Sequence, residues 1–239
     1  MGRETVSLKT TRAAVLIGLA TFTLTTLALH VLQPALSPRD EAISSYVHGN
    51  HGWLLTVGLI ALGTASLALT AVLATDGPGA KPGRWLLGVW GTGVLLGGLF
   101  SGDPPGNWSA PPSAAGMIHG NAAMVAFLAL PSGALFLARS FRRDPRWKEA
   151  APHLSGLAVA TTVSLVAFYA SLMPVFIRPG PPILLGLSER ILVGLYVAWL
   201  AVVAVNLPTS AGSRITTVSG LLRQAKSEIR SSTGSSTLK

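Results

Sequence analysis

The stretch GWLLTVGLIALGTASLALTAVLAT, residues 52–75, contains no acidic or basic residue. As a helix rising 1.5 Å per residue, it is long enough to cross roughly 30 Å of hydrocarbon. Apolar residues occupy every side of that helix, whereas a helix on the surface of a soluble protein shows one apolar stripe. Because backbone groups in hydrocarbon need internal partners, the stretch predicts a transmembrane helix.

Five further runs have the same character. Only 11% of the chain is charged, against roughly 25% in soluble domains, and 49% is apolar. We therefore predict an all-α polytopic membrane protein, with six transmembrane helices in one bundle at residues 13–207. Besides 52–75, the expected spans are 13–35, 84–101, 116–138, 154–177 and 183–207.

The basic residues are sorted onto alternate connections of these six spans. Four segments carry 15 of the 18 Lys and Arg residues: 1–12, 76–84, 139–153 and 208–239. The other connections keep only Arg39, Arg178 and Arg190. This asymmetry predicts that both termini are cytoplasmic. It also assigns the net charge of +9 to topology and to contact with membrane lipids, and it argues against nucleic-acid binding.

The two ends of the chain differ from the spans. Residues 1–12 read as a cytoplasmic N-terminus, and the run after them is too long for a signal peptide core, so we expect it to be retained as a span. Residues 208–239 read as a basic tail, with an amphipathic stretch on the membrane surface before a disordered end. The chain contains no cysteine, which excludes disulfides and thiolate chemistry. A homo-oligomer is neither predicted nor excluded.

Small residues at four-residue spacing suggest where helices approach closely. Gly93 and Gly97 place the third span inside the bundle, and Gly194 with Ala198 suggests a weaker contact for the sixth span. Pro131 interrupts the hydrogen bonding of the fourth span and is expected to kink it.

Most ionisable residues outside the basic segments gather at the opposite ends of the spans. Their sequence contexts are HGNHGW for His48 and His51, SGDPPG for Asp103, IHGNAA for His119 and SER for Glu189 and Arg190. His30 closes the first span at the same level. Four or five helices would therefore bring polar side chains to one membrane level. We expect an outward-facing polar pocket there.

Two main interpretations of this cluster stay open. In the first, the residues cap helices and pair across the bundle, as Glu189 at a helix start and Asp103 in a turn would do. In the second, His48, His51, His119 and Asp103 bind a metal, with zinc the most suitable. His48 and His51 would share a face if they lay on one helix.

The metal interpretation implies a hydrolase acting on a lipid-like substrate. Metal-bound water would be the nucleophile, Glu189 or Asp103 the catalytic carboxylate, and Arg190 with His119 the ligand-binding groups. A haem ligated by pairs among His30, His51 and His119 has no other support in the sequence. A transporter of a neutral or amphiphilic solute is the remaining alternative, although the cytoplasmic halves of the spans are almost bare of ionisable groups.

Three segments resemble a known family: GLFSGDPPG at 98–106, GMIHGNAA at 116–123 and SERILVGLY at 188–196. They are similar to the bacterial six-span integral membrane proteins grouped as domain of unknown function 998. Ser101 and Gly102 depart from the proline and threonine typical before the aspartate. The resemblance implies the fold over roughly residues 13–207 and marks Asp103, His119 and the Glu189–Arg190 pair as family-like. It implies no activity.

Overall fold

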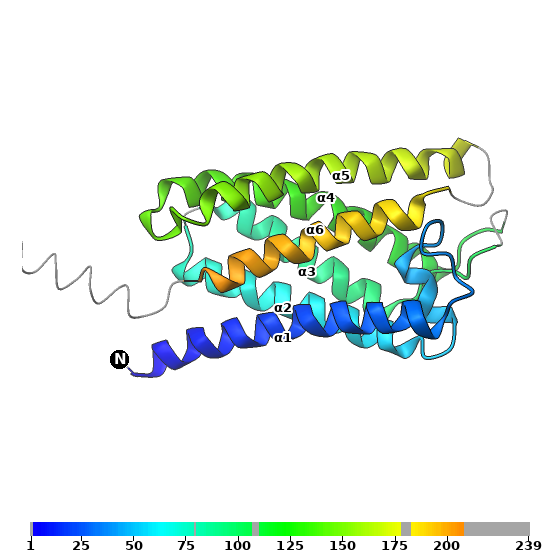
Figure 1. Ribbon diagram of the computed structural model, residues 1–239, viewed down its shortest axis with the longest axis horizontal. Helices are drawn as coiled ribbons and strands as arrows, with labels where there is room; N and C mark the ends of the chain where they lie inside the picture. Colours follow the sequence, from blue (N-terminus) through cyan, green and yellow to red (C-terminus); the bar gives the residue numbers. More distant parts are fainter. Residues whose placement is uncertain (1, 79, 107–109, 178–182, 208–239) are drawn as a thin grey trace, which may run out of the picture.

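Six long helices form an elongated bundle in the computed structural model (Figure 1). The structure describes residues 2–78, 80–106, 110–177 and 183–207, which contain no strand, so the all-α prediction is confirmed for them. Each helix packs on the next along the chain, and α6 also contacts α1. The helices are α1 (Gly2–Leu32), α2 (Trp53–Asp76), α3 (Lys81–Leu99), α4 (Ala114–Arg143), α5 (Ala151–Ile177) and α6 (Leu185–Val205), with short 3-10 helices η1 (Ile43–His48) and η2 (Pro145–Trp147) between them.

Among the described helices, α1, α2, α4, α5 and α6 are long and apolar enough to cross a membrane. The expected third span corresponds to α3, which is not among these five. Its glycines, together with Lys81 and Arg84, lower its mean hydropathy. The sequence therefore identified the six helices, and five of them have the composition of membrane spans.

The helix boundaries differ from the expected spans where local chemistry intervenes. Helix α1 ends at Leu32 rather than at residue 35, because Pro34 disfavours helical geometry in the residue before it. The same helix begins at Gly2, so residues 2–12 continue it. The predictions for the tail 208–239 and for Arg178 lie outside the described residues.

The sides of the helices that face away from the bundle are apolar. Large side chains such as Ile17, Leu128 and Val163 are exposed in the middle of their helices. A soluble protein rarely exposes so much contiguous apolar surface, whereas lipid is a compatible surrounding. Hydroxyl groups in the helices turn back onto their own backbone, as Thr21 does to the Ile17 carbonyl at 2.9 Å. Many hydroxyl groups of the helices are therefore satisfied within their own helix.

Helix α3 packs closely between α2 and α4 through glycine. A Cβ atom at Gly93 would lie 2.7 Å from the Ala126 Cβ and 2.9 Å from the Ala122 carbonyl oxygen, so the prediction for Gly93 is confirmed. Gly97 is less constrained, since an added Cβ would meet only the His119 ring, at 3.8 Å. The prediction for Gly194 is wrong, because nothing lies within 4 Å of such an atom there.

A proline in α4 is compensated by a tyrosine from α6. Pro131 has no N–H, so the Phe127 carbonyl one turn earlier lacks its helical donor. The Tyr196 hydroxyl donates to that oxygen at 2.6 Å. The fully buried Tyr196 ring also meets Trp90 edge to face, with centroids 5.1 Å apart. This hydrogen bond joins α4 to α6 in the middle of the bundle.

The two ends of the bundle differ in chemistry. One end, here the basic end, carries Arg84, Arg139, Arg142, Arg143 and Arg146 on α3, α4 and the η2 connection. There Arg146 donates to the Asp144 carboxylate at 2.7 Å and lowers the pKa of that carboxyl below its ordinary value. The other end, here the histidine end, carries the connection from α1 to α2 and the start of α6 (Figure 1).

Replacing Tyr196 with Phe should lower the free energy of unfolding by about 1 kcal/mol, because the Phe127 carbonyl is left without a donor in an apolar interior. In a Pro131→Ala background the loss should be smaller, since alanine restores a backbone N–H at that position. The measurement is helix content during SDS titration from mixed micelles. Tyr169→Phe is the matched control, because its hydroxyl bonds the Met124 carbonyl, whose helical donor, Leu128, is intact. Equal losses in both backgrounds would contradict the compensation.

Candidate functional site

The connection from α1 to α2, residues 33–52, folds over the histidine end around one amide. Gln33 is 7% exposed, and its Nε2 donates to the carbonyls of Tyr46 at 2.9 Å and Asn50 at 2.7 Å. A Cβ atom at Gly49 would overlap the Gln33 amide, so any larger residue there would displace this side chain from its hydrogen bonds. The buried amide therefore holds η1 and the loop after it in one arrangement.

The start of α6 is bound to the same connection. The backbone N–H of Leu184 donates to the Asp40 carboxylate at 3.1 Å, and that of Leu187 donates to the Arg39 carbonyl at 2.9 Å. These bonds satisfy N–H groups that the first turn of a helix leaves without partners. Leu184 itself has a φ of 61°, a left-handed conformation that costs a leucine free energy. Hydrogen bonds to residues 33–52 therefore fix the first turn of α6 in place.

Glu189 lies one turn inside α6 and is 8% exposed. Its Oε2 accepts from the backbone N–H of Ile43 at 2.7 Å, the first residue of η1. A carboxylate at this position complements the positive end of a short helix. The side chain was expected to start α6, and instead it caps a different helix. Glu189 therefore joins α6 to η1 through this hydrogen bond.

Arg190 points to another side of α6 and joins three segments. Its Nε lies 2.7 Å from Nε2 of His30, on α1. Its Nη1 donates to the carbonyls of Glu41 at 2.8 Å and Gly186 at 2.9 Å, and its Nη2 donates to the Tyr46 hydroxyl at 3.2 Å. The guanidinium carbon also lies 5.5 Å from the centre of the Tyr46 ring.

The hydrogen bonds of His30 specify its tautomer. Its Nδ1 lies 2.7 Å from the Thr26 carbonyl oxygen, which can only accept, so Nδ1 carries the proton. The Nε–H of Arg190 donates to Nε2, so that nitrogen holds the lone pair. The geometry therefore requires a neutral His30. Across the described residues the ion pairs are Arg39–Asp40 and Arg146–Asp144, so Arg190 is held by neutral groups.

His119 lies on α4 and bonds to the end of α3. Its Nδ1 lies 2.8 Å from the Phe100 carbonyl and 3.1 Å from the Gly97 carbonyl, so this nitrogen is the donor. In the neutral ring Nε2 is then an acceptor, and no hydrogen-bond partner for it occurs in the part of the chain that the structure describes. His119 therefore joins α4 to α3 and keeps one nitrogen available.

His119 and Glu189 line the same internal cavity, of about 70 Å³. It lies where α1, η1, α2, α3, α4 and α6 meet, and its walls are mainly apolar. Ser44 is the third polar residue in the lining. A cavity of this size has room for a few water molecules or a small polar group. The larger lining side chains are Phe22, Leu55, Leu59, Leu62, Trp90, Phe127 and Val193.

Asp103 takes part in helix capping. Its Oδ2 accepts from the backbone N–H of Ser113 at 3.0 Å, and Ser113 in turn accepts from Gly116 at 2.9 Å, in the first turn of α4. A Cβ atom at Gly116 would overlap the Asp103 carboxylate. Asp103 is exposed and is not part of the cavity lining. Its position matches the capping interpretation rather than a shared site with Glu189.

His48 and His51 do not share a helix face as expected. His48 ends η1 and bonds through Nε2 to the Gly102 carbonyl at 2.9 Å, whereas His51 has a φ of 63° and lies before α2 begins. Both are exposed. Within the described ranges, no group of three His, Cys, Asp or Glu residues is arranged to hold a metal ion. His48 and His119 both lie against Gly102, next to Asp103, but the predicted zinc ligands His48, His51, His119 and Asp103 are not arranged to hold a metal together. The haem alternative gains no support, because His30 already accepts from Arg190.

Sequence reasoning missed two residues of this end, Gln33 and Tyr46. Gln33 binds backbone carbonyls, and the Tyr46 hydroxyl binds Arg190, 144 positions away in the sequence. Neither kind of partner leaves a pattern in the sequence. The available signal for Gln33 was an amide at the apolar end of a span, just before Pro34, where a buried polar group needs a partner.

A family model described as "Protein of unknown function (DUF998)" matches residues 16–206. The match covers all six helices apart from the first part of α1. Comparisons with curated proteins and with solved structures found no match.

Replacing Arg190 with Lys should release residues 33–52, because an ammonium group cannot bond His30, Tyr46 and the two carbonyls together. We expect a loss of about 2–4 kcal/mol in stability and faster amide exchange at residues 37–50. Hydrogen exchange with peptide-level mass spectrometry measures this. The control is Arg39→Lys, at an exposed arginine of the same connection. Exchange that is unchanged in Arg190→Lys would contradict the role of Arg190.

Proposed function

We propose that this chain, which belongs to the DUF998 family, is a six-span membrane protein that binds a small hydrogen-bond donor at its histidine end. One observation carries the proposal: Glu189 of α6 and His119 of α4 line the same internal cavity. Ionisable groups inside an apolar bundle are expensive and generally serve a function. The proposed site lies beneath residues 33–52, at the end of the bundle where the sequence predicts a polar pocket.

The hydrogen bonds of these two residues define the class of ligand. The Nδ1 proton of His119 is used by backbone carbonyls, so its Nε2 can accept. Glu189 offers carboxyl oxygens, which also accept. Two acceptors in a cavity of about 70 Å³ suit an amine or hydroxyl group attached to a short apolar group, which would contact Trp90 and Phe127. Arg190, whose donors bond protein groups, supports the site by holding residues 33–52 in place.

The proposal also includes the membrane topology, in which all six helices cross the membrane. Helix α3 lies between α2 and α4, and its neighbours on both sides have the composition of membrane spans. A bundle in which α3 crosses the membrane puts the basic end on one side and the histidine end on the other. The positive-inside bias then makes the basic end and both termini cytoplasmic, in a bacterial cell membrane.

The geometry supports the other two functions less. A metal-dependent hydrolase needs ligands that converge, and within the described residues no three His, Cys, Asp or Glu side chains are arranged to hold a metal ion. A transporter needs a path to the basic end, where Phe141, Trp147 and Trp199 are fully buried against one another. Ligand binding at the histidine end requires neither feature.

The ligand class can be tested by thermal unfolding with short primary alkylamines, the matching alcohols and the matching methyl ethers, which lack a donor. Amines and alcohols should stabilise the protein, by about 2.7 kcal/mol at a hundred times Kd, and ethers should not. Glu189→Gln keeps an oxygen for the Ile43 N–H and should abolish the effect of amines. His119→Asn keeps a donor in place of Nδ1 and should weaken the effect of both classes.

Two matched variants control this experiment. Glu149→Gln and His51→Asn make the same changes at exposed positions outside the cavity, and they should respond to amines and alcohols as the wild type does. A wild type that responds equally to ethers, or site variants that behave like the controls, would overturn the proposed ligand class.

The absence of cysteine makes the topology directly testable. Asp76→Cys precedes α3 and Ala110→Cys follows it, so a membrane-impermeant maleimide added to intact cells should label Ala110→Cys only. Both sites should react after the membrane is permeabilised. Labelling of both, or of neither, in intact cells would mean that α3 does not cross the membrane.

A further inference from the structure

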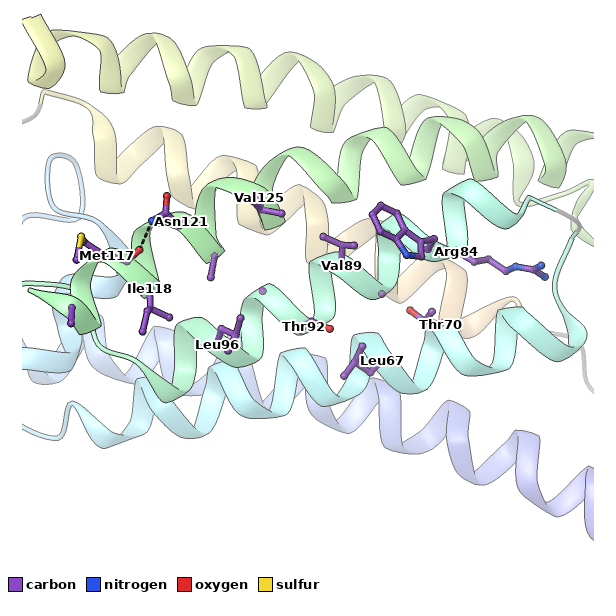
Figure 2. Close-up of a pocket in the computed structure, with 15 residues that line it drawn as sticks. Leu67, Thr70, Arg84, Val89, Thr92, Leu96, Met117, Ile118, Asn121 and Val125 are labelled. Atoms are coloured by element: carbon purple, nitrogen blue, oxygen red, sulfur yellow. Dashed lines mark hydrogen bonds between the residues drawn. The ribbon is translucent and has the colours of Figure 1, made fainter. Parts of the chain in front are cut away.

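A long groove runs along the exposed side of α3, between α2 and α4, with a volume of about 1010 Å³ (Figure 2). Its walls are mainly apolar, with Leu67 and Thr70 from α2, Val89, Thr92 and Leu96 from α3, and Ile118, Asn121 and Val125 from α4 among the lining residues. It lies on the outside of the bundle, apart from the cavity between Glu189 and His119 except for the shared Gly93.

The groove exists because α3 presents small residues on this side. A Cβ atom at Gly88 would meet only the Thr70 methyl group, at an ordinary 3.6 Å, and Thr92 is exposed. The α3 backbone is therefore accessible at Gly88, between the larger side chains of its neighbours. From Arg84 to Leu96 the groove follows about 18 Å of helix, close to the roughly 15 Å of one hydrocarbon leaflet.

Arg84 lies at the basic end of this groove, and its side chain extends toward the start of α3 (Figure 2). Its Nη1 donates to the Leu73 carbonyl at 2.9 Å and to the Ala74 carbonyl at 3.4 Å, which caps the end of α2. Its Nε and Nη2 have no partner among the described residues, and no described carboxylate lies within ion-pair distance. Trp85, which also lines the groove, is 69% exposed, as is common for tryptophan at a membrane interface.

We propose that this groove binds one anionic membrane lipid, with an acyl chain along α3 and its phosphate paired with Arg84. The groove is long enough for an acyl chain, and the unpaired Nε and Nη2 of Arg84 can donate to two phosphate oxygens. Basic pockets between membrane helices favour anionic headgroups for this reason. The acyl chain covers the backbone at Gly88 and the Thr92 side chain. The inference is independent of the ligand proposed for the histidine end.

Native mass spectrometry of the full chain tests this with phosphatidylglycerol and phosphatidylcholine of identical acyl chains. The wild type should retain one phosphatidylglycerol in preference to phosphatidylcholine. Arg84→Gln should lower that preference about fivefold, the effect of one basic residue at a membrane surface. Arg84→Lys should keep most of it, which separates the charge from the cap of α2.

A second variant tests the groove without touching Arg84. Gly88→Leu should lower retention of both lipids, because the leucine side chain occupies the groove. The fold should be preserved, because a Cβ atom at Gly88 makes only an ordinary contact with Thr70. Gly194→Leu, where an added Cβ meets nothing within 4 Å, is the matched control on α6 and should retain lipid as the wild type does.

Three results would overturn the proposal. The first is an equal lipid preference in the wild type and Arg84→Gln, and the second is equal retention in Gly88→Leu and Gly194→Leu. The third is a disulfide-linked dimer formed efficiently by Thr92→Cys in native membranes. The last result would mean that a second copy of the chain occupies the groove, and the cysteine-free background makes it unambiguous.

Discussion

Close contact between helix backbones along α3 is the constraint on which the rest of the bundle depends. A Cβ atom at Gly83 would lie 2.9 Å from the Gly133 carbonyl, and one at Gly98 would lie 3.0 Å from the Leu59 Cβ. Between helices in lipid, such packing replaces the hydrophobic effect as the main attraction. It draws α3 inward, which opens the outer groove on one side. On the other side it brings the last carbonyls of α3 within reach of His119.

Glu189 and Arg190 illustrate how two neighbouring residues can serve different segments. Successive residues on a helix point about 100° apart, so the carboxylate meets η1 and the guanidinium meets α1 and Tyr46. Neither group forms an ion pair with a described residue, and the hydrogen bonds of each go to neutral groups. Removing one partner would leave the other group poorly solvated, because uncompensated buried charges are costly. The pair therefore organises the whole histidine end.

The helices could be predicted because apolar runs without charges have few alternatives in hydrocarbon. The need of His119, Glu189 and Arg190 for polar partners could also be predicted, since ionisable residues near the ends of apolar helices are costly without them. Their partners were not readable, because Ile43, Gly97 and Phe100 contribute backbone atoms, which every residue has. The prediction that His48 and His51 share a helix face was wrong for a local reason. His48 ends η1 and His51 has a positive φ, so no continuous helix joins them. Asp103 was equally suited to a cap and to a metal, and sequence alone could not choose.

The bonds around residues 33–52 also imply an order of assembly. Those from Gln33 connect residues 13 and 17 positions apart, so the first two helices can make them soon after synthesis. Those from Glu189 and Arg190 span 144 to 160 positions. During translation Nε2 of His30, the Tyr46 hydroxyl and the Ile43 N–H therefore gain these partners only when α6 is made. Insertion of α6 is thus the step that turns a set of inserted helices into a closed bundle.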